Sequence, residues 1–144
     1  MQVTPYLNFD GNCAEAFAFY KDLFKGTVVY QGTFAEMPEG PDNPPIPPEA
    51  RDRIMHIHLQ IGQQALMGSD TMPGASEMCG GYSKPQGLWV SIGVESPAEG
   101  QRVFDALAQG GQTAMPFEKT FWSPGFGMVT DRFGTPWMVN VSAS

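Results

Sequence analysis

The chain has 144 residues, of which 42% are hydrophobic, and its formal net charge is −7 at pH 7. A chain of this length and apolar content can build one globular domain with its own core, and its composition is unlike that of disordered chains. It has only eight Lys and Arg residues, scattered along the sequence, which argues against a nucleic-acid partner because phosphate binding requires clustered basic side chains.

The first predicted elements are a short strand over residues 6–9 and a helix that begins after Asn12. Glu15 follows Asn12 by three residues, and this spacing predicts a capping box at the helix N-terminus. Apolar residues recur at helical spacing up to Phe24, and Gly26 is expected to end the helix. Three strands are predicted next, over residues 27–34, 54–61 and 64–69, the last two joined as a tight hairpin.

The same order of elements is predicted again downstream. A strand over residues 88–94 leads into a helix with Ser96 as its N-cap, Pro97 at its first position and Glu99 three residues after the cap. After Gly110 the sequence again predicts three strands, in this case over residues 112–117, 126–131 and 136–141.

A strand-helix-strand-strand-strand unit that occurs twice predicts an α+β fold built from two βαβββ modules, with a concave surface between them that could bind a ligand. The predicted boundaries are residues 1–70 for module one, 71–86 for a linker and 87–144 for module two, all within a single domain of residues 1–144.

Alternation along the predicted strands separates two faces of each sheet. One face is almost wholly apolar and is expected to pack under the helices; it comprises Leu7, Phe9, Met55, Ile57, Leu59, Ile61, Val90, Ile92, Val94, Trp137, Val139 and Val141. The other face mixes large apolar side chains with hydrogen-bonding groups; it comprises Tyr6, Asn8, His56, His58, Gln60, Met67, Ser69, Trp89, Ser91, Met138 and Asn140. This mixture is typical of a small-molecule cleft or a subunit interface, although a solvated sheet surface would have the same composition.

Several segments resemble the vicinal oxygen chelate superfamily, which includes glyoxalase I, extradiol dioxygenases, and fosfomycin and bleomycin resistance proteins. Within it, the chain is most similar to the PhnB-like family, whose members often carry a demethylubiquinone methyltransferase label. The similarity rests on residues 5–12, on residues 55–70, and above all on the Phe-Trp loop at 120–127 and the Asp-Arg-Phe-Gly segment at 131–140. It implies two βαβββ modules that form a cup-shaped mixed sheet with helices on its outer face, often completed in a dimer.

In enzymes of this superfamily a divalent metal lies in the cup, held by His and Glu side chains from the first and last strands of each module. The corresponding positions in this chain are Pro5 or Tyr6, Met67, Trp89 and Met138. None of them offers the imidazole or carboxylate that a hard divalent cation prefers. The resemblance therefore implies the cup, and these residues predict that the usual metal cofactor is absent.

His56 and His58 are the only histidines and point to the same side of one predicted strand. Three interpretations stay open: a ligand-binding pair, two ligands of a displaced metal site completed by Glu36, or two polar residues on a half-solvated face. Trp122 either covers the cup or anchors its own loop. Asp70 and Asp131 lie at strand ends, where an aspartate usually accepts hydrogen bonds from backbone N–H groups.

The sequence does not contain a G-x-G-x-x-G motif between a strand and a helix, which argues against a Rossmann-type S-adenosylmethionine site and thus against the methyltransferase label. The predicted function is metal-independent binding of a small molecule, as in glyoxalase/bleomycin resistance proteins, with the ligand unknown. The alternative is a divalent-metal lyase, isomerase or dioxygenase with non-standard ligands, so whether the protein is an enzyme stays open. The predicted ligand-binding residues are Tyr6, His56, His58, Met67, Trp89, Trp122, Met138 and Asn140.

Two expectations concern location and assembly. The N-terminus lacks a secretion signal, and no apolar run approaches the ~20 residues of a membrane helix. Cys13 and Cys79 have no metal-binding spacing and are expected to be reduced thiols, so the sequence predicts a cytoplasmic protein without a membrane partner. The large apolar residues on the mixed face predict a homodimer that uses part of that face.

Overall fold

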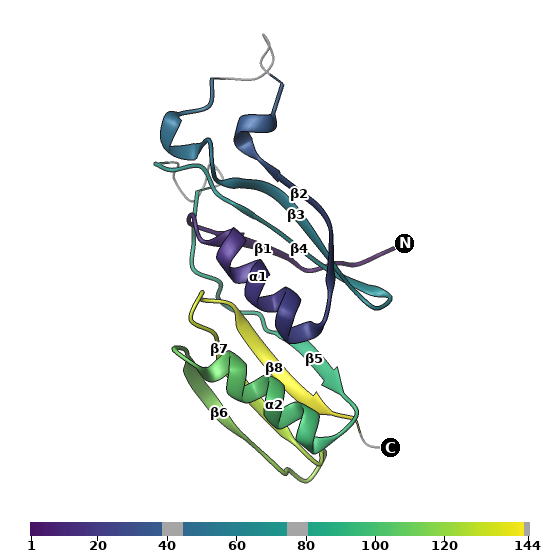
Figure 1. The fold of residues 1–144 in the computed structure, drawn as a ribbon. Helices are drawn as coiled ribbons and strands as arrows, with labels where there is room; N and C mark the ends of the chain where they lie inside the picture. Colours follow the sequence, from purple (N-terminus) through teal and green to yellow (C-terminus); the bar gives the residue numbers. More distant parts are fainter. Residues whose placement is uncertain (39–44, 75–80, 143–144) are drawn as a thin grey trace. The chain divides into compact units, whose positions relative to one another are not determined.

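The computed structural model describes residues 1–38, 45–74 and 81–142, and it contains the βαβββ unit twice (Figure 1). The first unit consists of β1 (Tyr6–Phe9), α1 (Cys13–Phe24), β2 (Thr27–Thr33), β3 (Ile54–Ile61) and β4 (Gln64–Asp70), with the short 3-10 helices η1 (Phe34–Glu36) and η2 (Pro48–Ala50) between β2 and β3. The second consists of β5 (Val90–Val94), α2 (Pro97–Ala108), β6 (Gln112–Glu118), β7 (Phe126–Thr130) and β8 (Pro136–Val141). The predicted α+β fold of two βαβββ modules is confirmed.

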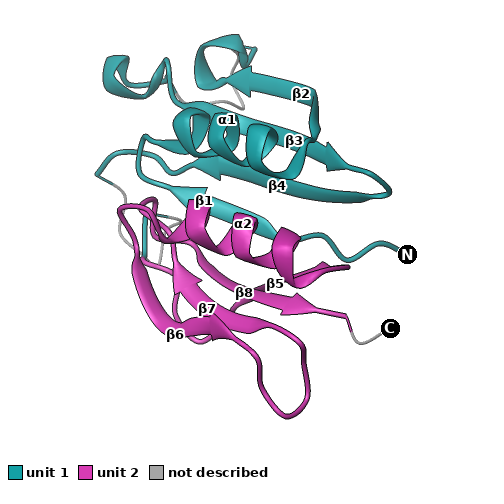
Figure 2. Ribbon diagram, turned by 60° about the horizontal axis from the view of Figure 1, so that its bottom comes forward, with its two compact units in different colours: residues 1–83 teal, residues 84–144 magenta. Residues whose placement is uncertain are grey.

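The chain divides into two compact units, residues 1–83 and 84–144 (Figure 2). Their four-stranded sheets have the same order, β1-β4-β3-β2 in the first and β5-β8-β7-β6 in the second. In each, the first strand pairs in parallel with the last, and the other pairings are antiparallel. One helix packs on one face of each sheet, so each unit has one helix-covered face and one open face (Figure 1).

The helix-covered faces form the cores, as their apolar pattern predicts. Phe17 of α1 lies so close to β4 that a Cβ atom at Gly68 would be 2.6 Å from its ring. Phe104 of α2 approaches β7 in the same way, 2.7 Å from a Cβ atom placed at Gly127. A glycine at each of these positions therefore allows a phenylalanine ring to pack directly on the sheet backbone. The largest fully buried side chains are Phe9, Phe17, Tyr20, Ile57, Leu59, Leu107, Val129, Trp137, Val139 and Val141.

The two helix N-termini are capped differently. Ser96 accepts a hydrogen bond from the Glu99 N–H at 3.2 Å, as predicted. The capping box predicted at Asn12 is wrong, because the Asn12 side chain makes no capping bond to a described residue. Asp70, from the end of β4, takes over this role and accepts hydrogen bonds from the N–H groups of Gly11 and Cys13.

The C-terminus of α1 also differs from the prediction. Lys25, rather than Gly26, adopts the left-handed conformation that ends the helix, with φ of 56°. Gly26 is required for a different reason, since a Cβ atom there would lie 2.8 Å from the Gln60 carbonyl oxygen of β3. Close approach of the backbone to a neighbouring strand, and not turn geometry, explains this glycine.

Other boundaries shift by one or two residues. Phe34 begins η1 instead of ending β2, and β5 begins at Val90, so Trp89 precedes the strand. The segment predicted as a linker starts on the first unit, because the Thr71 N–H donates to the Phe9 carbonyl oxygen at 2.8 Å. Tyr82 packs there too, and burial together with the charge of Asp10 raises the pKa of its phenol.

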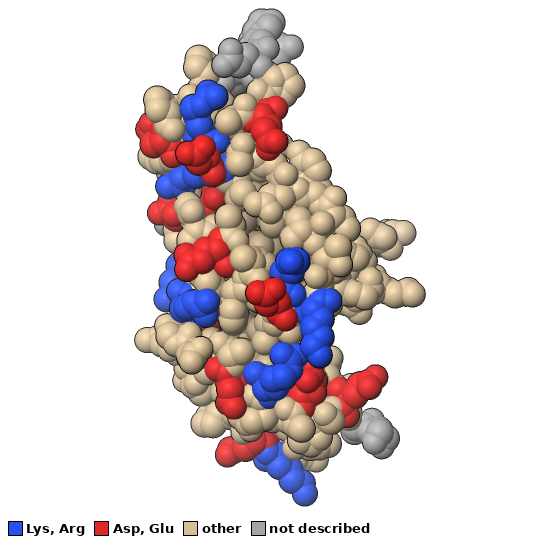
Figure 3. Space-filling model, viewed as in Figure 1, with Lys and Arg blue, Asp and Glu red and all other residues tan. Residues whose placement is uncertain are grey.

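Among the described residues, the face of the molecule in Figure 3 has no separate basic patch. Lys and Arg side chains lie among Asp and Glu side chains on the face shown in Figure 3. Within the described part of the chain, the structure contains no helix of the length and apolar character needed to cross a membrane. Cys13 is a buried free thiol, whereas Cys79 lies outside the described residues.

Candidate functional site

The open face of the first sheet carries a row of large polar and aromatic side chains. Strand register places Tyr6 of β1 beside Met67 of β4, and Met67 beside His58 of β3. Tyr30 of β2 pairs with His58 and completes the row. Tyr6 and Tyr30 lie on the two edge strands and are 47% and 49% exposed, so these side chains are available to a ligand.

His56 lies in the neighbouring row and contacts both tyrosines. The Tyr6 hydroxyl is 3.0 Å from His56 Nδ1, and the two rings stack with centroids 5.6 Å apart. The Tyr30 ring centroid also lies close to the imidazole, at 5.8 Å. The Tyr6 hydroxyl engages Nδ1, whereas Nε2 makes no hydrogen bond to a described residue, so Nε2 is the ring nitrogen left to bond to a ligand.

Gly32 is what allows Tyr30 to take this position. It pairs with His56 across β2 and β3, and a Cβ atom there would lie 2.6 Å from the Tyr30 hydroxyl. The missing side chain thus leaves room for the Tyr30 hydroxyl next to the strand. We refer to Tyr6, Tyr30 and His56 as the tyrosine–histidine cluster.

His58 faces the same way as His56 but is held by a different partner. Its Nε2 lies 3.1 Å from Gln60 Oε1, and the Gln60 Nε2 group donates to the Gly62 carbonyl oxygen at 3.0 Å. This second bond orients the amide, so its oxygen accepts and His58 Nε2 carries the proton. The two histidines therefore share a sheet face while their bound ring nitrogens engage different neighbours.

Glu36 lies near the start of β3, the strand that carries both histidines, as expected. Its carboxylate, however, already accepts a hydrogen bond. Its Oε2 accepts a hydrogen bond from the Thr33 N–H. No three His, Cys, Asp or Glu side chains within the described ranges, the trio of His56, His58 and Glu36 included, are grouped so that they could hold a metal ion.

The positions that the resemblance to the superfamily assigns to metal ligands carry unsuitable donors here. In the first unit they are Pro5 or Tyr6, and Met67; Tyr6 and Met67 are direct neighbours on β1 and β4. On the second sheet Met138 pairs with Ser91, and Trp89 lies before β5 begins. Thioethers, an indole and a single phenol do not fit a hard divalent cation.

The open face of the second sheet carries the remaining predicted residues. Asn140 pairs with Phe126 across β8 and β7, and Met138 lies two residues before it on the same face. The Trp122 ring packs edge-on against Phe126, with centroids 5.4 Å apart. Trp122, Met138 and Asn140 therefore belong to one surface, with Trp122 itself 50% exposed.

Ser123 anchors the loop that carries Trp122. Its hydroxyl is buried and lies 2.7 Å from the Gly125 carbonyl oxygen and 3.0 Å from that of Val141. The sequence interpretation missed Ser123, because a serine in a Gly- and Pro-containing loop looks like an ordinary surface residue. Ser123 holds the loop in place, and the neighbouring Trp122 indole packs against Phe126.

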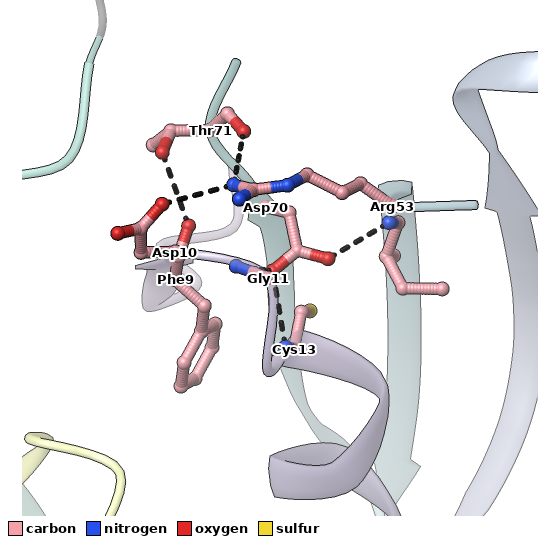
Figure 4. Close-up of polar contacts among 8 residues, drawn as sticks. Phe9, Asp10, Gly11, Cys13, Arg53, Asp70 and Thr71 are labelled. Carbon is pink, nitrogen blue, oxygen red and sulfur yellow. Dashed lines mark hydrogen bonds and ion pairs between the residues drawn. The ribbon is translucent and has the colours of Figure 1, made fainter. Parts of the chain in front are cut away.

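Asp70 has a structural role, as predicted from its position at a strand end (Figure 4). Its carboxylate is 3% exposed and accepts hydrogen bonds from the N–H groups of Gly11, Cys13 and Ile54 at 2.8, 3.0 and 2.9 Å. Burial, with the nearby Asp70 charge, raises the pKa of the Cys13 thiol, so this cysteine stays protonated at neutral pH.

Asp131 acts in the same way in the second unit. One of its oxygens accepts from the N–H groups of Phe133 and Thr135, and the other accepts from the Trp137 indole at 2.8 Å. Both aspartates thus hold turns and element ends together, and the predicted structural role is confirmed for each.

Comparison with known proteins identifies the family. The family model described as 3-demethylubiquinone-9 3-methyltransferase matches residues 1–140. The chain belongs to this PhnB-like family. It is also 37% identical to the protein YjdN of Escherichia coli K12 over 98% of this chain and 95% of that protein.

Solved structures support the same assignment. The crystal structure of protein PA1353 from Pseudomonas aeruginosa matches this PhnB-like chain with a TM-score of 0.85 and 42% identity, covering 100% of this chain and 99% of that one. The fosfomycin resistance protein FosX of Listeria monocytogenes, in a complex with Mn(II) and 1S,2S-dihydroxypropylphosphonic acid, matches at a TM-score of 0.64 and 10% identity, over 99% of this chain and 93% of that one. At this identity the likeness to FosX shows a shared fold and no more.

Proposed function

We propose that this PhnB-like protein binds a small aromatic or amphipathic molecule on the open faces of its sheets, and that binding does not require a metal. The tyrosine–histidine cluster is the observation that carries the proposal. Two half-exposed phenol rings, and an imidazole whose Nε2 makes no hydrogen bond to a described residue, stand on a sheet face that the helix of the same unit does not cover. Such a group combines flat apolar surfaces with directed polar atoms, as binding sites for small molecules do.

Met67 adds to the suitability of this surface. It lies directly between Tyr6 and His58 in the strand register, and its flexible thioether side chain can adapt to the shape of an apolar ligand. A ligand that stacks on Tyr6 or Tyr30 could accept a hydrogen bond from His56 Nε2 or donate one to it, depending on the tautomer. The surface therefore suits a molecule with an aromatic ring and one polar substituent.

Metal independence is supported by the donor chemistry. The fold relative FosX was solved with Mn(II), but the corresponding positions here carry the phenol, thioethers and indole described above. The Glu36 carboxylate lies near Gly32, as the Tyr30 hydroxyl does, and accepts a hydrogen bond from the Thr33 N–H at 2.6 Å. A cation would have to displace that bond, and would still lack a set of three converging ligands among the described residues.

Binding by the tyrosine–histidine cluster can be tested with a thermal-shift screen of aromatic metabolites on untagged protein, in the presence and absence of EDTA. A ligand of the site should raise the melting temperature equally in both conditions, because ligands stabilise the state they bind. His56→Gln should weaken the best ligand by about tenfold, the effect of one hydrogen bond to a ring nitrogen. Gln63→Ala, in the exposed β3–β4 turn, is the matched control and should bind normally.

Two results would count against the proposal. One is a set of stabilising ligands that all lose their effect in EDTA, with elemental analysis showing a stoichiometric metal. The other is a ligand whose affinity is the same in wild type, His56→Gln and His58→Gln protein.

We also propose that the protein forms a homodimer that covers part of these open faces. Leu88, Trp89, Met115, Phe121 and Trp122 of the second unit are all more than a third exposed, which is an unusual concentration of large apolar side chains on 61 residues. Sedimentation velocity at micromolar concentration should show a dimer, and Trp122→Ser should shift it toward monomer. A wild-type monomer under these conditions would contradict this part of the proposal.

A further inference from the structure

The turn between β1 and α1 contains a chemically reactive pair of residues, Asp10 and Gly11. It is the only Asp-Gly pair in the chain, and the chain has no Asn-Gly pair. Gly11 has no Cβ atom, so nothing on its own residue hinders the approach of its backbone nitrogen to the preceding side chain. Attack of this nitrogen on Asp10 Cγ is the route by which aspartyl peptides slowly isomerise in water.

The fold keeps this pair at the surface. The Asp10 side chain is 59% exposed, so water reaches its carboxyl group. Gly11 has a φ of 98°, a conformation that other residues rarely adopt. The turn therefore requires a glycine after Asp10, and the reactive pair cannot be removed at Gly11 without backbone strain.

Two hydrogen bonds restrain the atoms that would react. The Gly11 N–H donates to Asp70 Oδ1 at 2.8 Å, and Arg53 Nη1 donates to Asp10 Oδ1 at 3.0 Å (Figure 4). The same Arg53 nitrogen donates to the Thr71 carbonyl oxygen at 3.0 Å, which ties the guanidinium to the end of β4. Asp70 lies 59 residues from Gly11, and Arg53 lies 43 residues from Asp10. Both the nucleophile and the carboxyl group are thus held by distant segments of the first unit.

We propose that Asp10 is a site of covalent modification, the isomerisation of aspartate to isoaspartate, and that it reacts when the contacts to Asp70 and Arg53 open. The Gly11 nitrogen forms a bond to Asp10 Cγ and loses its proton, and a carboxyl oxygen leaves as water, which gives a succinimide. Water then adds to the Asp10 main-chain carbonyl carbon and breaks its bond to the Gly11 nitrogen. One water is released and one is consumed, so the mass is unchanged and no oxidant, cofactor or enzyme is required.

The product would disturb the start of α1. In isoaspartate the main chain runs through Cβ and Cγ, which lengthens the backbone before Gly11 and Cys13. Their N–H groups, which now donate to Asp70 at 2.8 and 3.0 Å, would no longer both reach its carboxylate. The inference goes beyond the proposed ligand binding and does not depend on it, because none of these residues belongs to the tyrosine–histidine cluster.

The test follows uptake of ¹⁸O at residue 10. Purified protein is incubated at neutral pH in ¹⁸O-labelled water, either folded or unfolded in urea, and the peptide with residue 10 is analysed by liquid chromatography and mass spectrometry. Each opening of the succinimide by water adds one ¹⁸O atom, and the isoaspartyl peptide elutes apart from the aspartyl peptide. We expect the reaction in both states, roughly tenfold or more slower in folded protein, because the Gly11–Asp70 bond must break first.

Four variants separate local opening from global unfolding. Arg53→Met should raise the rate in folded protein about fivefold, the effect of losing a part-exposed charged contact. Arg51→Met removes the same charge from an exposed neighbour and is the matched control, with a rate like that of the wild type. Ile57→Ala weakens the core without touching either contact and should also leave the rate unchanged. Asp10→Glu should abolish the reaction, because the longer side chain disfavours ring closure.

Each part of the proposal can be overturned separately. A lack of ¹⁸O at residue 10 in both folded and unfolded protein would exclude the modification. Equal rates in the two states, or equal rates in Arg53→Met and Arg51→Met protein, would show that the contacts do not control it. If Ile57→Ala reacts as fast as Arg53→Met, global unfolding rather than local opening governs the reaction, and the proposed control by Asp70 and Arg53 is wrong.

Discussion

Asp70→Ala is expected to lower the free energy of unfolding by about 3–5 kcal/mol, which is a large share of the stability of a domain this size. The variant removes the acceptor of three backbone N–H groups, those of Gly11, Cys13 and Ile54. Two of these bonds are buried, so water cannot replace the carboxylate without rearrangement. The charge of Asp70 also lies at the N-terminus of α1, where the helix dipole favours it.

Asp10→Ala is the matched control for this experiment. Asp10 is drawn with Asp70 in the group of polar contacts in Figure 4 and forms an ion pair with Arg53 at 3.0 Å. Its side chain, however, is 59% exposed. Exposed ion pairs contribute about 0–1 kcal/mol, so this variant should unfold almost like the wild type. If Asp70→Ala is no less stable than Asp10→Ala, the capping role of Asp70 in the first unit is wrong.

The distribution of aromatic residues makes it possible to follow each unit separately. All four tyrosines lie in residues 1–83, and all three tryptophans lie in residues 84–144. Tryptophan fluorescence therefore reports on the second unit, and near-ultraviolet tyrosine signals report on the first. If Asp70→Ala shifts the tyrosine transition to lower denaturant than the tryptophan transition, the units unfold separately; coincident shifts indicate one cooperative transition.

Ile57→Ala is the second change with a large expected effect, a loss of about 2–5 kcal/mol in the free energy of unfolding. Ile57 is 1% exposed and lies on the helix-covered face of the first sheet, beside Gly68. Truncation removes buried apolar surface and leaves a cavity under α1. Urea unfolding followed by far-ultraviolet circular dichroism measures the loss.

His56→Gln is the companion to this variant, because the two residues are adjacent on β3 and face opposite sides. It should cost less than about 1 kcal/mol of stability, since His56 lies on the open face, and it should weaken ligand binding. Ile57→Ala protein that remains folded should retain its affinity. The reverse pattern, with stability lost in His56→Gln and retained in Ile57→Ala, would mean that the assignment of the two faces is wrong.

The sequence alone determined the repeated βαβββ order, the assignment of the main strand faces and the cap at Ser96. These features are encoded locally, because burial imposes a period of two on a strand and about 3.6 on a helix, and because a cap acts within one turn. The placement of Ile57 in the core and of His56 on the open face follows from alternation within a single strand.

Tyr30 is a residue whose face of the sheet does not follow from alternation along its strand. Val28 pairs with Leu59 on the helix-covered face, and alternation would place Tyr30 on that face too. The register of β2 shifts between these residues, which turns Tyr30 to the open face beside His58. A bulge of this kind is decided by pairing with the neighbouring strand, so the sequence of β2 did not reveal it.

Only the tertiary structure decided the contacts that join distant parts of each unit. Asp70 caps a helix that begins 57 residues earlier, and Tyr6 bonds to a histidine 50 residues away. Whether Asn140 Oδ1 finds a hydrogen-bond donor likewise depends on which side chains the neighbouring strands place around it, and no described residue donates to it. Hydrogen bonding is satisfied or left unsatisfied by groups close in space, and the local sequence pattern specifies which face a residue occupies but not which distant residue meets it there.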